Sequence, residues 1–178
     1  MPPPKKIVVI GPESTGKSTL CEQLAAKFHT EWVPEFARQY LLSLRRPYNY
    51  DDLLIIAKGQ LEQEDKLVDS LKTSVIFIDT DMYVMKVWCE FVFGKCHPFI
   101  LDEIVKRKYD AYLLCNTDLP WIADELREYP DPESRNRLYR MYKDLMVNQS
   151  TPWYDISGGY EERLEKAIAN CQLLMVNS

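Results

Sequence analysis

The segment from Ile7 to Leu20 contains residues whose types and spacing are suited to holding phosphate groups. It reads IVVIGPESTGKSTL, and it matches the pattern G-x-x-x-x-G-K-[ST] of a phosphate-binding P-loop. Glycines let the backbone bend tightly and approach phosphate oxygens, while N–H groups of the loop and of the next helix point at the anion. The segment therefore predicts a nucleoside triphosphate site. A glycine-rich turn without a ligand is disfavoured by the apolar run and the amphipathic run that flank it.

Individual residues of this loop have expected roles in binding ATP. The ammonium group of Lys17 supplies positive charge for the β- and γ-phosphates. The hydroxyl of Ser18 is a suitable ligand for Mg²⁺, which usually stays partly hydrated and bridges substrate phosphates. The loop residues that we expect to contact ATP are Gly11, Pro12, Glu13, Ser14, Thr15, Gly16, Lys17, Ser18 and Thr19.

Two aspartates, Asp79 and Asp81, follow the apolar run 74–78. A carboxylate at this place in a P-loop enzyme can hold Mg²⁺ or accept a proton from a nucleophile. The alternative is a helix cap, because aspartate is common at that position. We expect Asp79 to bind the metal together with Ser18, and Asp81 to contact substrate or to cap the next helix.

Glu35 and Arg38 lie one helical turn apart, after an extended stretch. Glu35 could accept the proton of an acceptor hydroxyl, and Arg38 could neutralise charge on the transferring group. An ordinary ion pair on a helix surface has the same spacing, so both interpretations stay open. The general base is either Glu35 or Asp81.

Arginines gather between the last two predicted strands, where they could close over a transferring phosphoryl group. The alternative is a solvated helix face that nearby acidic residues balance. The arginines are Arg127, Arg135, Arg137 and Arg140. The turn at Ser157 and Gly158 could pack against a purine, although a plain turn between strand and helix has the same composition. Trp32, Trp88 and Trp121 could stack on an aromatic substrate, or they could pack in the core.

The rest of the chain predicts elements that bring these residues together. Apolar runs at 6–10, 74–78, 110–115 and 153–156 indicate strands, and 29–34 indicates a strand or a loop. Helical patterns cover 17–28, 35–44, 51–72, 82–93, 99–108 and 133–146, and a last helix ends near Met175. This alternation predicts a three-layer α/β/α fold with a parallel five-stranded sheet, in one domain over residues 1–178. Ligands of such sheets bind beyond the carboxyl ends of the strands.

Composition narrows the class of protein. The chain has 178 residues, a net charge of −5 and no long basic run, so we expect no nucleic-acid partner. No apolar run reaches membrane length, so we expect no membrane contact. The five cysteines are scattered, and we expect reduced thiols in a cytoplasmic protein. The sequence around Asp79 and Asn116 lacks the D-x-x-G and N-K-x-D motifs of GTPases, and a G-x-G-x-x-G dinucleotide motif is absent too.

Several stretches, in order, resemble the ribosylnicotinamide kinase domain of the NadR family of NAD-salvage proteins. They are residues 11–18, 35–38, 77–81, 94–99 and 121–127, together with Arg135. The resemblance implies a kinase-type P-loop NTPase fold and transfer of the ATP γ-phosphate to the 5′-hydroxyl of nicotinamide riboside, giving nicotinamide mononucleotide for NAD biosynthesis. It also implies functional roles for Glu35, Arg38, Asp79, Asp81, Asp124 and Arg127, and a lid region at about 121–150 in which Arg127 and Arg135 are lid arginines.

Two features depart from that family. Its members have a tryptophan directly before the glutamate, thought to stack on the nicotinamide ring, and here that position is Pro34. Trp32 could serve instead, because residues two apart in an extended chain face the same side. Family members also often carry an adenylyltransferase domain on the N-terminal side, and because the first predicted strand begins at Lys6 we expect no such activity from this chain.

The sequence thus predicts a kinase that uses ATP and Mg²⁺ and phosphorylates a small nucleoside-like molecule. The residues expected to act in catalysis are Lys17, Glu35, Arg38, Asp79, Asp81, Arg127 and Arg135. One alternative is a kinase for another nucleoside or a nucleoside monophosphate. A second alternative is a non-catalytic, ATP-binding regulatory module. The sequence predicts no oligomeric state.

Overall fold

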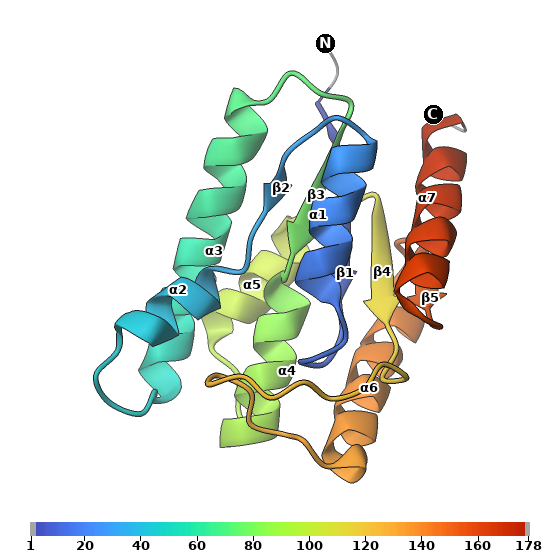
Figure 1. Ribbon diagram of the computed structural model, residues 1–178. Helices are drawn as coiled ribbons and strands as arrows, with labels where there is room; N and C mark the ends of the chain where they lie inside the picture. Colours follow the sequence, from blue (N-terminus) through green and yellow to red (C-terminus); the bar gives the residue numbers. More distant parts are fainter. Residues whose placement is uncertain (1–2, 177–178) are drawn as a thin grey trace.

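Five parallel strands form one sheet at the centre of the computed structural model, which describes residues 3–176 (Figure 1). In spatial order β2-β3-β1-β4-β5, their bounds are Trp32–Val33, Val75–Asp79, Lys5–Ile10, Ala111–Cys115 and Trp153–Ile156. Val8 of β1 lies between Ile78 and Tyr112 in the register of the sheet. The central place of β1 explains its unbroken apolar run, because a strand covered on both faces has no side chain that meets water.

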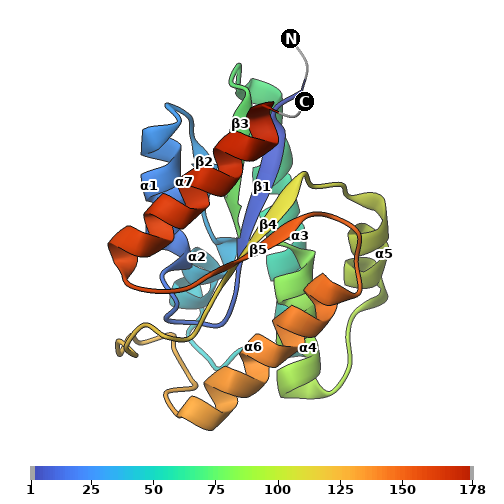
Figure 2. The same cartoon turned by 90° about the vertical axis from the view of Figure 1, so that its right-hand side faces the viewer.

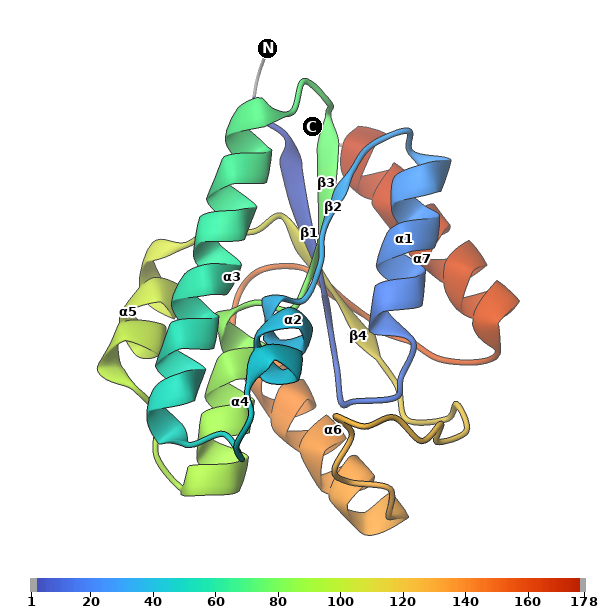
Figure 3. The same cartoon turned by 60° about the vertical axis from the view of Figure 1, so that its left-hand side comes forward.

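Helices cover both faces of the sheet (Figure 3). Helices α1 (Lys17–Lys27) and α7 (Tyr160–Val176) cover one face, where Leu24 and Ala167 pack with Phe77. The other face is covered by α3 (Tyr50–Ser70), α4 (Met82–Phe93), α5 (Pro98–Lys106) and α6 (Pro132–Val147). The short α2 (Phe36–Ser43) packs against α3. The predicted three-layer α/β/α fold with a five-stranded parallel sheet is confirmed.

Local contacts explain where the elements differ from the sequence-based expectations. Residues 32–33 form a short strand, which decides between the strand and the loop expected at 29–34. Helix α3 begins before Asp51, because the side chain of Asn49 accepts hydrogen bonds from the backbone N–H groups of Asp51 and Asp52. Residues 121–131 form neither helix nor strand, and only the second part of the expected lid region, α6, is helical.

Parallel pairing places the carboxyl ends of all five strands at one edge of the sheet. The loop after β1, the N-terminus of α4, the long connection after β4 and the turn before α7 therefore meet there (Figure 2). This edge carries the residues that the sequence predicts to act in chemistry. Over residues 3–176, none of the helices is both long enough and apolar enough to cross a membrane.

Candidate active site

The loop between β1 and α1 bends sharply because two glycines have backbone torsions that other residues rarely adopt. Gly11 has a φ of 140° and Gly16 a φ of 79°. A Cβ atom on Gly11 would lie 2.7 Å from the carbonyl oxygen of Cys115 in the neighbouring β4. The loop can therefore pass close to β4 only with glycine at this position, and it then turns directly into the N-terminus of α1.

The side chain of Lys17 is bound to the backbone of the loop to which it belongs. The ammonium Nζ of Lys17 donates to the carbonyl oxygen of Pro12 at 3.0 Å. The hydroxyl of Thr15 donates to the same oxygen at 2.7 Å. The positive charge thus lies beside backbone N–H groups at a helix N-terminus, an arrangement that favours bound phosphate.

Ser18 and Asp79 bring two oxygen donors together next to the loop. The Oγ of Ser18 donates to Oδ2 of Asp79 at 2.5 Å. Asp79 is fully buried at the end of β3, and this burial raises the pKa of its carboxyl group, while the charge of Lys17 and the bond from Ser18 lower it. Residues 3–176 contain no group of three or more His, Cys, Asp or Glu side chains that could hold a metal. Two hard oxygen donors beside a phosphate site nevertheless suit Mg²⁺, which keeps waters and substrate phosphates as further ligands.

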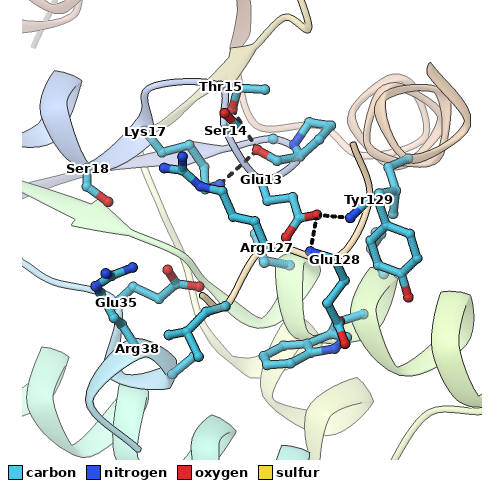
Figure 4. Close-up of a pocket in the computed structure, with 18 of the residues that line it drawn as sticks. Glu13, Ser14, Thr15, Lys17, Ser18, Glu35, Arg38, Arg127, Glu128 and Tyr129 are labelled. Atoms are coloured by element: carbon cyan, nitrogen blue, oxygen red, sulfur yellow. Dashed lines mark hydrogen bonds between the residues drawn. The ribbon is translucent and has the colours of Figure 1, made fainter. Parts of the chain in front are cut away.

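Glu35 and the phosphate loop line the same cavity, which has a volume of about 230 Å³ (Figure 4). Glu35 is half-buried and precedes the first residue of α2, so the short strand β2 delivers it to the carboxyl edge of the sheet. Its removal from water raises the pKa of Glu35 to about 7, and the negative charge of Asp79 adds to this, whereas Lys17 and Arg38 oppose it. A carboxylate with such a pKa can accept a proton near neutral pH.

Arg38 forms an ion pair with the long connection after β4 and not with Glu35, one helical turn away. Its Nη1 and Nη2 atoms donate to the two carboxylate oxygens of Asp124 at 3.1 and 3.0 Å. One of the two interpretations of the spacing is an ion pair between Arg38 and Glu35 on the helix surface. In the structure Arg38 is paired with Asp124 instead. Arg127 lines the cavity as well, and its Nη1 donates to the carbonyl oxygen of Ile122 at 2.6 Å.

The segment 119–131 lies over the phosphate loop, and two loop side chains hold it there (Figure 4). The Oε1 of Glu13 accepts hydrogen bonds from the backbone N–H groups of Glu128 and Tyr129, at 2.9 and 2.5 Å. The hydroxyl oxygen of Ser14 accepts one from the N–H of Ile122 at 2.9 Å. Both loop residues are expected to contact ATP and both line the cavity, and their side-chain oxygens also connect the loop to the segment above it.

Asp81 lies outside the cavity, in contact with α4 and β4. Its Oδ1 accepts hydrogen bonds from the backbone N–H groups of Tyr83 and Val84, and its Oδ2 accepts one from the hydroxyl of Tyr112 at 3.0 Å. Burial raises the pKa of Asp81 to about 7. Of the two roles that the sequence left open, the structure contains the helix cap.

Arg135 also does not line the cavity. It is almost completely buried on α6, and its Nη2 donates to the carbonyl oxygens of Ser14 and Leu119 at 3.3 and 3.0 Å. Its guanidinium lies 5.8 Å from the centre of the Trp121 ring. In this structure the expected lid arginine therefore bonds to the backbone of the phosphate loop and of the connection after β4.

Ser157 and Gly158 do not line the cavity, and a residue that the sequence did not indicate connects Gly158 to the phosphate loop. Arg163 of α7 donates to the carbonyl oxygens of Thr15 and Gly158, at 2.9 and 2.7 Å. It also donates to the carbonyl oxygen of Asn116 at 2.9 Å and to the carboxylate of Asp118. A single arginine in an amphipathic helix gives no sequence signal for this role.

Aromatic side chains make up part of the wall of the cavity, and most of them had no signal in the sequence. They are Tyr48, Trp88, Phe91, Tyr129 and Tyr142. Trp32, the expected substitute for a tryptophan at Pro34, packs instead with the core on the α1 and α7 side of the sheet. Trp121 contacts Arg135. Of the three tryptophans considered for stacking, Trp88 lines this cavity.

Comparisons with known proteins agree with this architecture. Residues 6–163 match the family model described as an AAA domain. The chain is 30% identical over 169 residues to the trifunctional NAD biosynthesis/regulator protein NadR of Salmonella typhimurium. This match covers 92% of the present chain and 41% of that protein. The NadR protein of Escherichia coli is also 30% identical, over 171 residues, with 94% and 41% covered. The chain thus spans about two fifths of the length of these curated relatives.

Solved structures share the fold over nearly the whole chain. Crystal structures of NadR protein in complex with NR, and in complex with NAD and AMP-PNP, match with TM-scores of 0.80 and 0.74 at 23% and 24% identity, and each match covers 96% of this chain and 49% of that one. A thymidylate kinase from Ehrlichia chaffeensis matches with a TM-score of 0.64 at 14% identity, covering 95% and 99%. The predicted kinase-type P-loop fold is therefore confirmed.

Proposed function

The chain belongs to the AAA domain family, and from this premise we propose that it is an ATP-dependent kinase of a small ribonucleoside. Nicotinamide riboside is the first-choice acceptor and nicotinamide mononucleotide the product, in cytoplasmic NAD biosynthesis. One observation carries the proposal: a phosphate loop, a carboxylate with a raised pKa and an aromatic wall line a single cavity. The similarity to NadR supports the same chemistry.

At the phosphate end, the loop N–H groups and Lys17 bind the β- and γ-phosphates of ATP. Ser18 and Asp79 would hold Mg²⁺, since their oxygens lie 2.5 Å apart beside the loop. When bound, the metal ion neutralises charge on the phosphate oxygens. Arg38 and Arg127 stabilise the negative charge of the transferring phosphoryl group, and Arg135 acts through the loop carbonyl that it binds.

At the acceptor end, Glu35 is the proposed general base, because it lines the cavity and Asp81 does not. The 5′-oxygen of the acceptor forms a bond to the γ-phosphorus of ATP, and the bond from that phosphorus to the bridging oxygen breaks. The hydroxyl proton passes to the carboxylate of Glu35, and ADP leaves with the electron pair of the broken bond. A pKa of about 7 suits a group that must be ionised before the step and protonated after it.

A second candidate is a kinase for a different nucleoside or a nucleoside monophosphate. Pro34 occupies the position of the stacking tryptophan in the NadR family, and Trp32 packs away from the cavity. The aromatic wall therefore differs from the one that the resemblance implies. This difference affects the base that the cavity accepts and leaves the phosphate chemistry unchanged.

The deciding experiment measures ADP formation by the purified protein with MgATP, with and without nicotinamide riboside, and identifies nicotinamide mononucleotide by mass spectrometry. Strong stimulation with that product supports the first choice. Stimulation by another nucleoside or a nucleoside monophosphate, and not by nicotinamide riboside, supports the second candidate. ATP binding with no stimulation by any acceptor would contradict both and favour a regulatory module.

A further inference from the structure

A chain of hydrogen bonds runs along the aromatic wall of the cavity. The indole Nε1 of Trp88 donates to the hydroxyl oxygen of Tyr48 at 3.2 Å. That hydroxyl donates to Oε2 of Glu128 at 2.8 Å. The three residues come from α4, from the loop between α2 and α3, and from the segment over the phosphate loop, and all three line the cavity.

Packing fixes the middle residue of this chain. The ring of Tyr48 makes T-shaped contacts with Trp88 and Phe93, with ring centres 5.3 and 6.2 Å apart and interplanar angles of 72° and 77°. Burial raises the pKa of Tyr48, so its hydroxyl stays neutral and keeps its proton for the bond to Glu128. With one proton received and one donated, the hydroxyl fixes the orientation of the indole ring.

Glu128 extends the chain to the phosphate loop. Its side chain accepts from Tyr48, and its own backbone N–H donates to Glu13 at 2.9 Å. The aromatic wall and the phosphate loop are therefore connected through one residue. A change in the position of the indole ring is coupled in this way to the segment that covers the loop.

We propose that the indole ring of Trp88 is the surface on which the aromatic base of the acceptor lies, and that Tyr48 and Glu128 are positioning residues that hold this ring. The proposal rests on the proposed function and adds the site of the base. The ligand class is a planar aromatic ring attached to ribose. Aromatic faces bind such rings by stacking, and binding of the base then orients the ribose hydroxyl toward Glu35 and the phosphate loop.

The test combines direct binding with kinetics. Isothermal titration calorimetry measures binding of nicotinamide riboside, adenosine and uridine to the wild type and to Trp88→Ala, and steady-state assays give KM and kcat for the acceptor and for ATP. We expect Trp88→Ala to weaken acceptor binding by about 10- to 100-fold, the usual effect of removing a stacking ring. Should this variant not fold, Trp88→Phe keeps a planar ring, so it should retain binding but lose the acceptor-induced change in tryptophan fluorescence.

The positioning residues have their own variants and a matched control. Tyr48→Phe removes the hydroxyl and should raise the acceptor KM about tenfold, with the ATP KM unchanged within about twofold. Glu128→Gln still accepts the bond from Tyr48 and should stay close to the wild type. Tyr109→Phe is the matched control, because it removes the same hydroxyl from another tyrosine–carboxylate pair. The hydroxyl of Tyr109 donates to Oε2 of Glu64 at 2.9 Å, and Tyr109 lies just before β4, at the opposite edge of the sheet. This control should leave the acceptor KM unchanged.

The outcomes separate this proposal from the proposed function. If the wild type phosphorylates a nucleoside and Trp88→Ala binds that nucleoside equally well, the base site is elsewhere and the kinase assignment stands. If Tyr48→Phe raises the KM values of both substrates equally, or no more than Tyr109→Phe does, the positioning role is refuted. If no nucleoside binds to the wild type by calorimetry, both proposals are overturned.

Discussion

Replacing Glu35 with glutamine tests which carboxylate accepts the proton of the acceptor. Glutamine keeps the shape of the side chain and cannot accept a proton. A general base usually contributes a factor of about 10² to 10⁴ to the rate, so Glu35→Gln should lower kcat by this amount at saturating ATP. The acceptor KM should change much less, because the aromatic wall of the cavity is intact.

The raised pKa of Glu35 gives the expected pH dependence. A carboxyl group with a pKa of about 7 is about one-tenth ionised at pH 6 and about nine-tenths ionised at pH 8. The ionised form is the one that accepts a proton, so kcat/KM of the wild type should rise about tenfold over that interval. The residual activity of Glu35→Gln should lack this rise. Initial rates of ADP formation at constant ionic strength measure both.

Asp81→Asn is the matched control, because the pKa of Asp81 is also raised to about 7 and the residue lies outside the cavity. Asparagine still caps a helix, so activity and its pH dependence should persist. The native state keeps the Asp81 proton up to a higher pH than the unfolded state does, so wild-type stability falls as the pH rises toward 7, and the variant avoids this loss. Loss of the pH-dependent rise in Asp81→Asn, with the rise retained in Glu35→Gln, would refute the assignment.

Three further variants probe the phosphate loop and its support. Lys17→Ala should lower kcat at least about 100-fold, because it removes the positive charge beside the phosphates. The thermal midpoint should change little, since the ammonium group bonds to Pro12 of the same loop, and near-normal turnover would refute the kinase assignment. Gly11→Ala places a Cβ atom 2.7 Å from the carbonyl oxygen of Cys115, so unfolding free energy should fall by about 1–3 kcal/mol, and calorimetry should find weaker ATP binding. Arg163→Ala should lower the free energy of unfolding, measured by urea denaturation, by about 1–3 kcal/mol, because it leaves backbone carbonyl groups unpaired; an unchanged free energy of unfolding would contradict this support role.

Much of the fold could be predicted because its determinants are local. The apolar run of β1 and the motif that follows it specify a buried strand, a tight loop and a helix within one short stretch of sequence. The predicted start of α3, at residue 51, is one residue too late, because the cap is Asn49, whose side chain accepts hydrogen bonds from the backbone N–H groups of Asp51 and Asp52. Residues 121–131 could not be assigned from sequence because they form no regular helix or strand, and contacts with Glu13 and Ser14 of the phosphate loop, far away in the sequence, help to fix their position.

The site could be predicted only where a motif or a strand end marks it. Lys17, Ser18 and Asp79 lie together as expected, because parallel strands bring their carboxyl ends to one edge. Asp81 lies two residues beyond Asp79, but the chain does not stay extended between them, because Thr80 has a φ of 80°; the side chain of Asp81 therefore meets α4 and Tyr112. Of the aromatic wall, the sequence indicated Trp88 alone, since the wall residues come from segments far apart in the sequence.

Arg38 takes its position from the segment over the phosphate loop, and under the proposed function this contact would connect acceptor binding to catalysis. Both of its terminal nitrogens bond to Asp124, and the same segment bonds to Glu13 and Ser14 of the loop. The side chain of Arg38 is exposed and would be mobile without a partner, and a charged bond at two nitrogens fixes its guanidinium group. Arg38 is therefore oriented when the segment lies over the loop. Glu128 also connects the segment to the aromatic wall through Tyr48, so the groups proposed to stabilise the phosphoryl group and those proposed to hold the acceptor are linked by one chain of hydrogen bonds.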